Sequence, residues 1–167
     1  PFTAPTFMIK NKKISQLVCI LIYVISFYIS YLITPESISN IWLKITIWHI
    51  YATLFIYIGS VILKNSSLYD PFWSVAPVPI VIYLATQYQN STTLKVLVLG
   101  PILFWAIRLT RNWIISWKGF DHEDFRYIDL KNTNKFKAEF NNFFGIHLFP
   151  TLIVNLGLFP LLYVLTN

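Results

Sequence analysis

From residue 14 to residue 34 the chain reads ISQLVCILIYVISFYISYLIT, which is a run of 21 residues without a charged side chain. A helix rises about 1.5 Å per residue and the hydrocarbon core of a bilayer is about 30 Å thick, so about 20 apolar residues span it. Lys12 and Lys13 precede the run, and Pro35 and Glu36 follow it. A secretory signal has a shorter apolar stretch and a small-residue cleavage site, so this run predicts a retained membrane-spanning helix.

Further apolar runs of similar length follow along the chain. The third carries Pro71, Pro77 and Pro79, and because proline lacks a backbone N–H, we expect a broken or kinked helix there. The pattern predicts an all-α, polytopic membrane bundle with about five transmembrane helices, which form a single membrane domain over residues 1–167. The expected spans are residues 14–34, 45–63, 71–89, 96–117 and 143–165.

The composition agrees with a protein in contact with the lipid bilayer. Hydrophobic residues make up 56% of the chain and charged residues 12%, whereas a soluble domain is about 45–50% apolar and about 25% charged. Seven of the 13 Lys and Arg and five of the seven Asp and Glu lie between Arg108 and Glu139. Because positive and negative side chains are mixed in this segment, it forms no basic surface that would bind nucleic-acid phosphates. Cys19 is the only cysteine, which excludes a disulfide framework and a cysteine-based zinc site.

The distribution of Lys and Arg over the short loops predicts the orientation. If the N-terminus is cytoplasmic, 11 of the 13 lie on that side, and only Lys44 and Lys95 lie on the other. Since cytoplasmic loops carry the excess of Lys and Arg, we expect a cytoplasmic N-terminus and a cytoplasmic polar loop over residues 108–142.

Arg108 and Arg111 are the first residues that a plain membrane helix does not explain. They are three residues apart, so their side chains share one helix face. An Arg at mid-depth costs about 2.5–3.5 kcal/mol and almost always faces a cavity or a partner. The alternative is that both snorkel to the cytoplasmic surface. If they face a cavity, the pair of forked donors suits a phosphate.

Two other stretches contain candidate functional residues. Residues 117–127 mix charged and aromatic side chains, and they form either a solvated loop or a cap that binds a polar cofactor. A metal site is not favoured, because His122, Glu123 and Asp124 are consecutive and would point in different directions. Asp70 precedes Pro71, so it can cap a helix, or it can be an acid at the mouth of a cavity opposite Arg108.

Four motifs together resemble a known family. They are DPFWS at 70–74, RLTRNW at 108–113 followed by WKG at 117–119, HEDFRY at 122–127, and FGIHLFP at 144–150. The combination resembles the uncharacterised branch of the steroid 5-alpha-reductase-like integral membrane proteins. The resemblance implies an enzyme that uses NADPH to reduce a carbon–carbon double bond in a lipid-like substrate, a steroid or another enone. It also implies an endoplasmic reticulum membrane if the source is eukaryotic.

The resemblance also implies roles for particular residues. Arg108 would face the nicotinamide or the substrate carbonyl, and we take Arg108 and Asp70 as the catalytic candidates. Hydride transfer to an enone develops negative charge on the carbonyl oxygen, so a donor aimed at that oxygen stabilises the transition state. The expected cofactor-binding residues are Arg111, Trp117, His122, Glu123, Asp124, Arg126 and Tyr127.

The chain departs from the family pattern in two ways. Characterised steroid reductases use a Tyr with an acidic partner, and if Arg111 matches their arginine, Arg108 occupies the Tyr position. That difference weakens the case for a steroid and leaves another lipid open. The chain also lacks a motif of the type Ser-Arg-His-Pro-Asn-Tyr, so we expect a fragment without the C-terminal helices and with little or no reductase activity. The alternatives are a non-enzymatic membrane scaffold, a degenerate paralogue, or a lipid methyltransferase-like protein.

Overall fold

The computed structural model describes residue 9 and residues 11–166, and within these residues the chain is helical and contains no strand. Five helical segments are long and apolar enough to cross a membrane: Lys12–Ile33, Ile41–Leu63, Ser66–Gln87, Thr92–Ser116 and Lys135–Thr166. The prediction of an all-α bundle with about five spans in an integral membrane protein is therefore confirmed.

The first, second and fourth spans are single helices, whereas the third span is broken into shorter segments. The single helices are α1 (Lys12–Ile33), α2 (Ile41–Leu63) and α5 (Thr92–Ser116). The third span consists of η1 (Ser66–Tyr69), α3 (Phe72–Val75) and α4 (Pro77–Gln87). Pro71 separates η1 from α3, and Pro77 begins α4, so the break lies where the prolines remove backbone donors.

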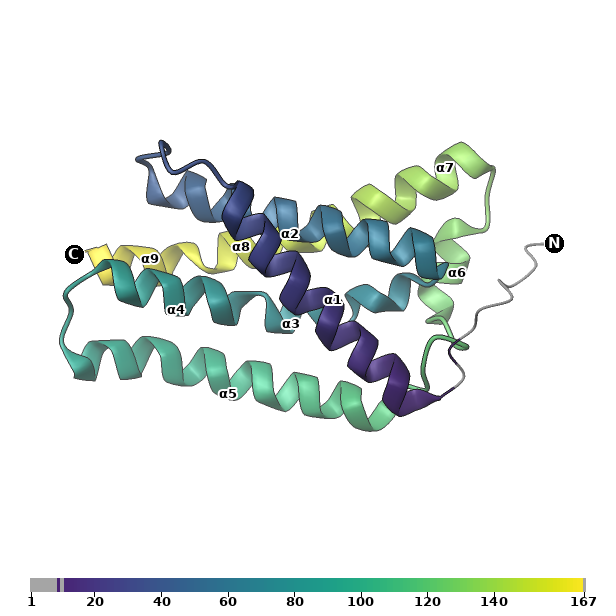
Figure 1. The fold of residues 1–167 in the computed structure, drawn as a ribbon, viewed down its shortest axis with the longest axis horizontal. Helices are drawn as coiled ribbons and strands as arrows, with labels where there is room; N and C mark the ends of the chain where they lie inside the picture. The colour runs from purple at the N-terminus through teal and green to yellow at the C-terminus, as the bar shows by residue number, and fades with distance from the viewer. Residues whose placement is uncertain (1–8, 10, 167) are drawn as a thin grey trace.

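The fifth span is longer than the bilayer requires. After α6 (Phe125–Lys131), the chain continues through α7 (Lys135–Phe140), the π-helical η2 (Asn141–Leu148), α8 (Phe149–Gly157) and α9 (Phe159–Thr166). The continuous segment has 32 residues, which is about 48 Å of helix against a hydrocarbon core of about 30 Å. Figure 1 shows α7 leaning away from the bundle beside α6, so this end of the segment extends past the other helices.

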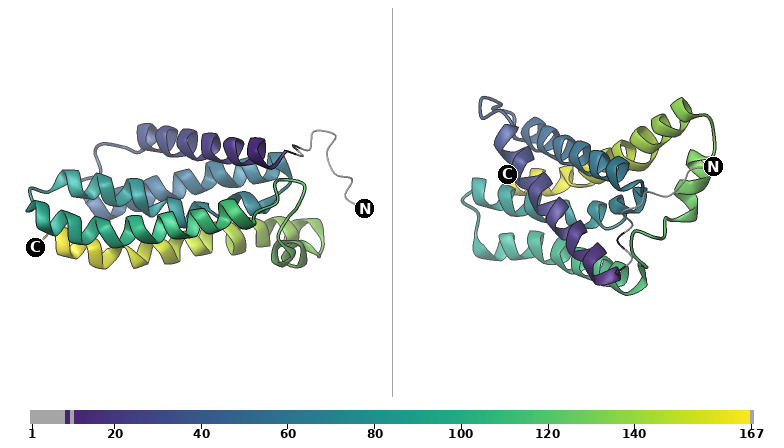
Figure 2. Two further views of the ribbon diagram at one scale, coloured as in Figure 1. Left: turned by 90° about the horizontal axis from the view of Figure 1, so that it is seen from below. Right: turned by 45° about the vertical axis from the view of Figure 1, so that its right-hand side comes forward.

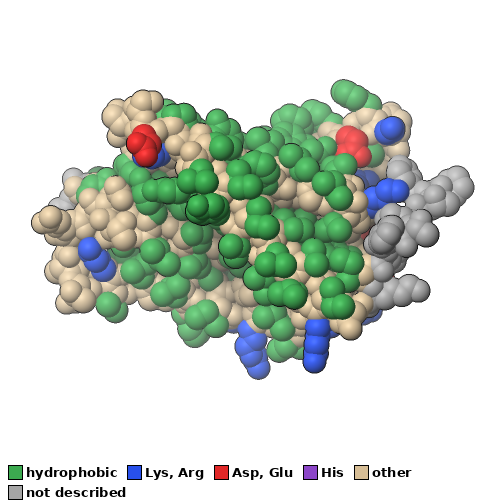
Figure 3. Space-filling model, in the orientation of Figure 1, with side chains coloured by type: hydrophobic (Ala, Val, Ile, Leu, Met, Phe, Trp, Pro, Cys, Tyr) green, Lys and Arg blue, Asp and Glu red, His purple; other side chains and the backbone are tan. Residues whose placement is uncertain are grey.

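The helices run along the long axis of the molecule, so the two ends differ in content (Figures 1 and 2). One end, called here the polar end, holds the start of α1, the end of α5, and α6 and α7. The opposite end holds the α1–α2 and α4–α5 connections. Figure 3 shows hydrophobic side chains over most of the face between these ends. The segment that carries most of the charged residues therefore lies at one end of the molecule. The assignment of this polar end to the cytoplasm stays a prediction.

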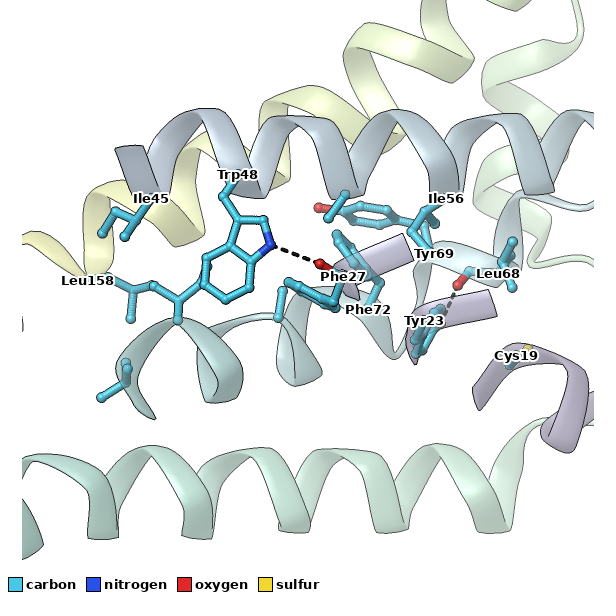
Figure 4. Close-up of a cluster of buried hydrophobic side chains, with 14 of the residues drawn as sticks. Cys19, Tyr23, Phe27, Ile45, Trp48, Ile56, Leu68, Tyr69, Phe72 and Leu158 are labelled. Carbon is cyan, nitrogen blue, oxygen red and sulfur yellow. Dashed lines mark hydrogen bonds between the residues drawn. The ribbon is translucent and has the colours of Figure 1, made fainter. Parts of the chain in front are cut away.

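The buried core lies where α1 and α2 meet the broken third span (Figure 4). Phe72 is fully buried, and its ring lies 5.6 Å from that of Phe27 and 5.7 Å from that of Tyr23. The Tyr23 hydroxyl donates to the carbonyl of Leu68, and Trp48 Nε1 donates to the carbonyl of Phe27 at 3.0 Å. The first contact satisfies a carbonyl just before the break and holds the break against α1, and the second joins α1 to α2.

Helix α5 lies at the edge of the bundle. Only Val98 and Ala106 are buried among its residues, whereas its apolar side chains such as Phe104 and Ile107 are largely exposed. An apolar surface of this kind is what a lipid-facing helix presents to hydrocarbon chains. Toward its carboxyl end α5 again carries polar residues, from Arg108 to Ser116, and it packs against α3 and α4 of the third span.

Candidate functional site

A cavity of about 480 Å³ lies at the polar end. Three parts of the chain line it: the η1–α3 junction, the last turns of α5, and the segment from Lys118 into α6. The lining residues are Ser67, Asp70, Trp73, Leu109, Asn112, Trp113, Ser116, Trp117, Lys118, His122, Asp124, Arg126 and Tyr127. Its size lies within the range of about 300–1,000 Å³ that is usual for small-molecule sites. The cavity brings Asp70 together with five of the residues that the sequence assigned to cofactor binding.

A Tyr–Asp pair forms one part of the cavity wall. The Tyr127 hydroxyl, in the first turn of α6, donates to Asp70 Oδ1 at 2.5 Å. Both side chains are half-buried. Burial raises the pKa of the Tyr127 hydroxyl, and the nearby carboxylate of Asp70 raises it further, because both disfavour a phenolate. Tyr127 is therefore a phenol that keeps its proton.

This contact corrects the structural interpretation of Asp70. The sequence offered Asp70 as the cap of a helix that starts at Pro71. The N-cap of α3 is instead Pro71, and no side chain caps that helix. Asp70 precedes that N-cap by one residue, and its carboxylate accepts from Tyr127 instead.

A second acidic residue organises the loop that precedes α6. Asp124 caps α6 by accepting from the Arg126 N–H at 2.9 Å. It also accepts from the Arg126 guanidinium through two bonds of 2.8 Å, and these bonds hold the pKa of the Asp124 carboxyl below its usual range. The Asp124 N–H in turn donates to Ser67 Oγ at 2.9 Å. The loop is thereby joined to η1 across the cavity.

Glu123 lies beside the cavity without lining it. Its Oε1 accepts from the Ser66 N–H at 2.5 Å and from Lys131 Nζ at 2.5 Å. Lys131 also donates to Ser66 Oγ at 3.2 Å. Glu123 therefore anchors the loop to the start of η1, and its expected role in cofactor binding stays a prediction.

Arg108 and Arg111 also lie outside the cavity lining. Both side chains are exposed on α5, and neither has a hydrogen bond or ion pair with the residues that the structure describes. The face of α5 that lines the cavity carries Leu109, Asn112 and Trp113. The two arginines lie on the neighbouring face, so Arg108 does not share the cavity with Asp70. Their catalytic and cofactor roles stay predictions.

Stacked tryptophans form the wall on the α5 side. The rings of Trp113 and Trp117 are 4.8 Å apart with an interplanar angle of 25°. Trp73, on α3, lines the same cavity. Both indole nitrogens of the stacked pair are buried and have no hydrogen-bond acceptor in the described residues. A buried donor without a partner costs about 1–3 kcal/mol, and both nitrogens are closed off from solvent.

Trp117 was a candidate from the sequence, but its neighbours in the wall were not. Trp73, Asn112 and Trp113 were part of the quoted motifs, yet no role was assigned to them. The available signal was helical spacing, because residues 109, 112, 113 and 116 fall on one face of a helix. That face carries two polar residues and a Trp at the end of an otherwise apolar span.

Comparisons with known proteins give one match. A family model described as "Protein of unknown function (DUF1295)" matches residues 55–167, which contain every residue of the cavity. Searches of curated proteins and of solved structures found no match.

Proposed function

Because the chain belongs to the DUF1295 family, an uncharacterised membrane family, we propose its function from the cavity and from the motif resemblance. The proposal is a membrane-embedded, NADPH-dependent reductase of a carbon–carbon double bond in an enone lipid. The motifs that carry the resemblance contribute Asp70, Trp117, Lys118 and the residues from His122 to Tyr127, and most of these line the same cavity of about 480 Å³.

The Tyr127–Asp70 pair is the observation that carries the proposal. The resemblance implies a Tyr with an acidic partner, and Arg108 left that role without a Tyr in the sequence. Reduction of an enone adds a hydride to the β carbon and a proton to the α carbon. Burial keeps the Tyr127 phenol protonated, and its proton lies on the hydrogen bond to Asp70 at 2.5 Å. In this proposal the hydroxyl turns from Asp70 to the α carbon as the enolate forms, because an enolate carbon is a stronger base than a phenolate. Asp70 orients the phenol in this scheme.

The cavity has groups that fit NADPH. Bound NADPH would supply the hydride. Lys118 and Arg126 are exposed cations on the loop side of the cavity, and such cations bind phosphate oxygens. The stacked Trp113 and Trp117 offer planar surfaces on the other side. The loop side would hold the charged part of the cofactor.

The proposal is tested with variants that keep the shape of the cavity. Turnover is measured as NADPH oxidation with a long-chain enone, using the natural protein that carries this sequence in lipid nanodiscs. We expect Tyr127→Phe and Asp70→Asn to lower turnover by about 10²–10⁴, as loss of a general acid does, with little change in NADPH affinity. Tyr28→Phe is the matched control, because Tyr28 is exposed on α1 away from the cavity. Full activity in Tyr127→Phe would refute the assignment.

One observation favours a non-enzymatic scaffold as the second candidate. Charged groups near the cavity pair with one another, as in Asp124–Arg126 and Glu123–Lys131. Such pairing is sufficient to fold a loop without any ligand. Arg126→Ala separates the two candidates: weaker NADPH binding supports the reductase, whereas a wild-type protein that binds no NADPH supports the scaffold.

A further inference from the structure

Two arginines of α5, Arg108 and Arg111, lie in a candidate membrane span and outside the cavity. They are three residues apart, so they share one face of the helix. All seven Asp and Glu of the chain lie in described residues, and none of them pairs with either arginine. Charged residues within a span almost always have a partner, because an unpaired charge among hydrocarbon chains is costly. The partner of this pair is therefore not an acid of this chain.

The side chains beside the arginine pair place it against lipid. Phe104, one turn before Arg108, is 71% exposed, and Ile115, one turn after Arg111, is 60% exposed. Residues 104, 108, 111 and 115 follow the spacing of one helix face, so the pair lies within an exposed apolar stripe. The axis from Arg108 to Ser116, the last residue of α5, is about 12 Å long. Long arginine side chains can cover such a distance in part and reach the headgroups, while their stems stay in hydrocarbon.

The charge on this side of the molecule calls for an anion. Helix α5 contains no Asp or Glu, and Lys12 Nζ adds a further cation at its end by donating to the Ile115 carbonyl at 2.9 Å. Figure 3 shows Lys and Arg side chains projecting from the edge of the molecule that α5 forms. A second copy of the chain docked through this face would bring the arginines of both copies together without a counter-charge. An anionic lipid has the complementary charge and is present at this depth.

We infer that Arg108 and Arg111 bind the phosphate of an anionic phospholipid at the polar end, with its acyl chains along Phe104 and Ile107. Each guanidinium can donate two parallel hydrogen bonds to phosphate oxygens. The exposed side chains of Phe104 and Ile107 are the apolar part of the site, which a lipid uses and a free phosphate does not. The inference stands apart from the proposed reductase function, because none of these residues lines the cavity.

Lipid affinity tests the inference, using the natural protein that carries this sequence. Native mass spectrometry measures the binding of phosphatidylglycerol and of phosphatidylcholine, whose choline cancels the phosphate charge, at increasing lipid concentration in detergent micelles. Each Arg near an anionic headgroup strengthens binding about fivefold. We therefore expect Arg108→Gln and Arg111→Gln each to lower the affinity for phosphatidylglycerol about fivefold, and the double variant about 25-fold. Equal affinity of the wild type for the two lipids overturns the inference.

A matched control separates this site from a general attraction to anionic lipid. Lys135→Gln/Lys137→Gln removes the same charge from exposed residues of α7, also at the polar end, and we expect little change in affinity. An equal loss in this control overturns the site. Glycerol phosphate, which has no acyl chains, should not displace the lipid, and displacement at equal concentration overturns the lipid as the source of the phosphate. A dimer in micelles that is lost in the arginine variants overturns the inference in favour of a second copy.

Discussion

Glu123 offers the sharpest test of the structural interpretation of the site, because the sequence assigned it to the cofactor and the structure makes it an anchor. Its carboxylate accepts from the Ser66 N–H and from Lys131 Nζ. A hydrogen bond to a charged group contributes about 1.5–3 kcal/mol. Since the Glu123 and Lys131 side chains keep 15% and 23% exposure, solvent weakens the pair. We therefore expect Glu123→Ala to lower the free energy of loop docking by about 3 kcal/mol.

Hydrogen exchange measures this loss locally. A loss of about 3 kcal/mol corresponds to about a hundredfold increase in loop opening, so the Ser66 amide should exchange about a hundredfold faster in Glu123→Ala. Glu123→Gln retains an acceptor and should have a smaller effect. Glu36→Gln is the control, because Glu36 is exposed in the α1–α2 connection, at the opposite end of the molecule. Unchanged exchange at Ser66, combined with weaker NADPH binding, would refute the anchor and favour the cofactor role.

Three further predictions follow from the same geometry. The hydrogen bonds from Arg126 lower the pKa of the Asp124 carboxyl. Asp124 therefore stabilises loop docking at a pH above the ordinary Asp range, and this stabilisation is lost as the pH falls through the lowered pKa. Tryptophan fluorescence should show that transition in the wild type but not in Asp124→Asn. Phe72→Ala should lower the free energy of unfolding by about 3–5 kcal/mol, with Phe72→Leu less harmful, as measured by denaturation in mixed micelles. Arg111→Gln should leave NADPH affinity unchanged, since Arg111 does not line the cavity, and a clear loss of affinity would support the role implied by the resemblance instead.

The fold could be read from the sequence because the bilayer imposes a strong local rule. A helix must be long enough to satisfy its backbone across about 30 Å of hydrocarbon, and the apolar runs meet that rule one by one. The break before α4 was also foreseen, because Pro71 and Pro77 lack the backbone N–H that a continuous helix uses. The start of the fifth span was not foreseen. Lys135–Thr166 begins with the lysine-bearing α7, and charged residues at a helix end beyond the bilayer look like loop in a hydropathy pattern.

Only part of the candidate site could be predicted from the sequence. His122, Asp124 and Tyr127 are polar residues in an aromatic setting, and that contrast marked them. The same contrast also marked Glu123, which faces Lys131 and Ser66 beside the cavity. Trp113 carries no such contrast in a membrane protein, where tryptophan is expected at interfaces, so its place in the cavity wall could only be recognised in space.

By itself the sequence determined that this protein is a membrane bundle with one polar end, because span length, proline breaks and charge clustering are local properties of the chain. Only the tertiary structure decided which polar residues act together. Asp70 and Tyr127 are far apart along the chain and meet at 2.5 Å, while Arg108 lies one residue from Leu109 and yet outside the cavity. The physical reason is that a helix turns about 100° per residue. Which face meets a neighbour is set by packing between helices rather than by sequence order.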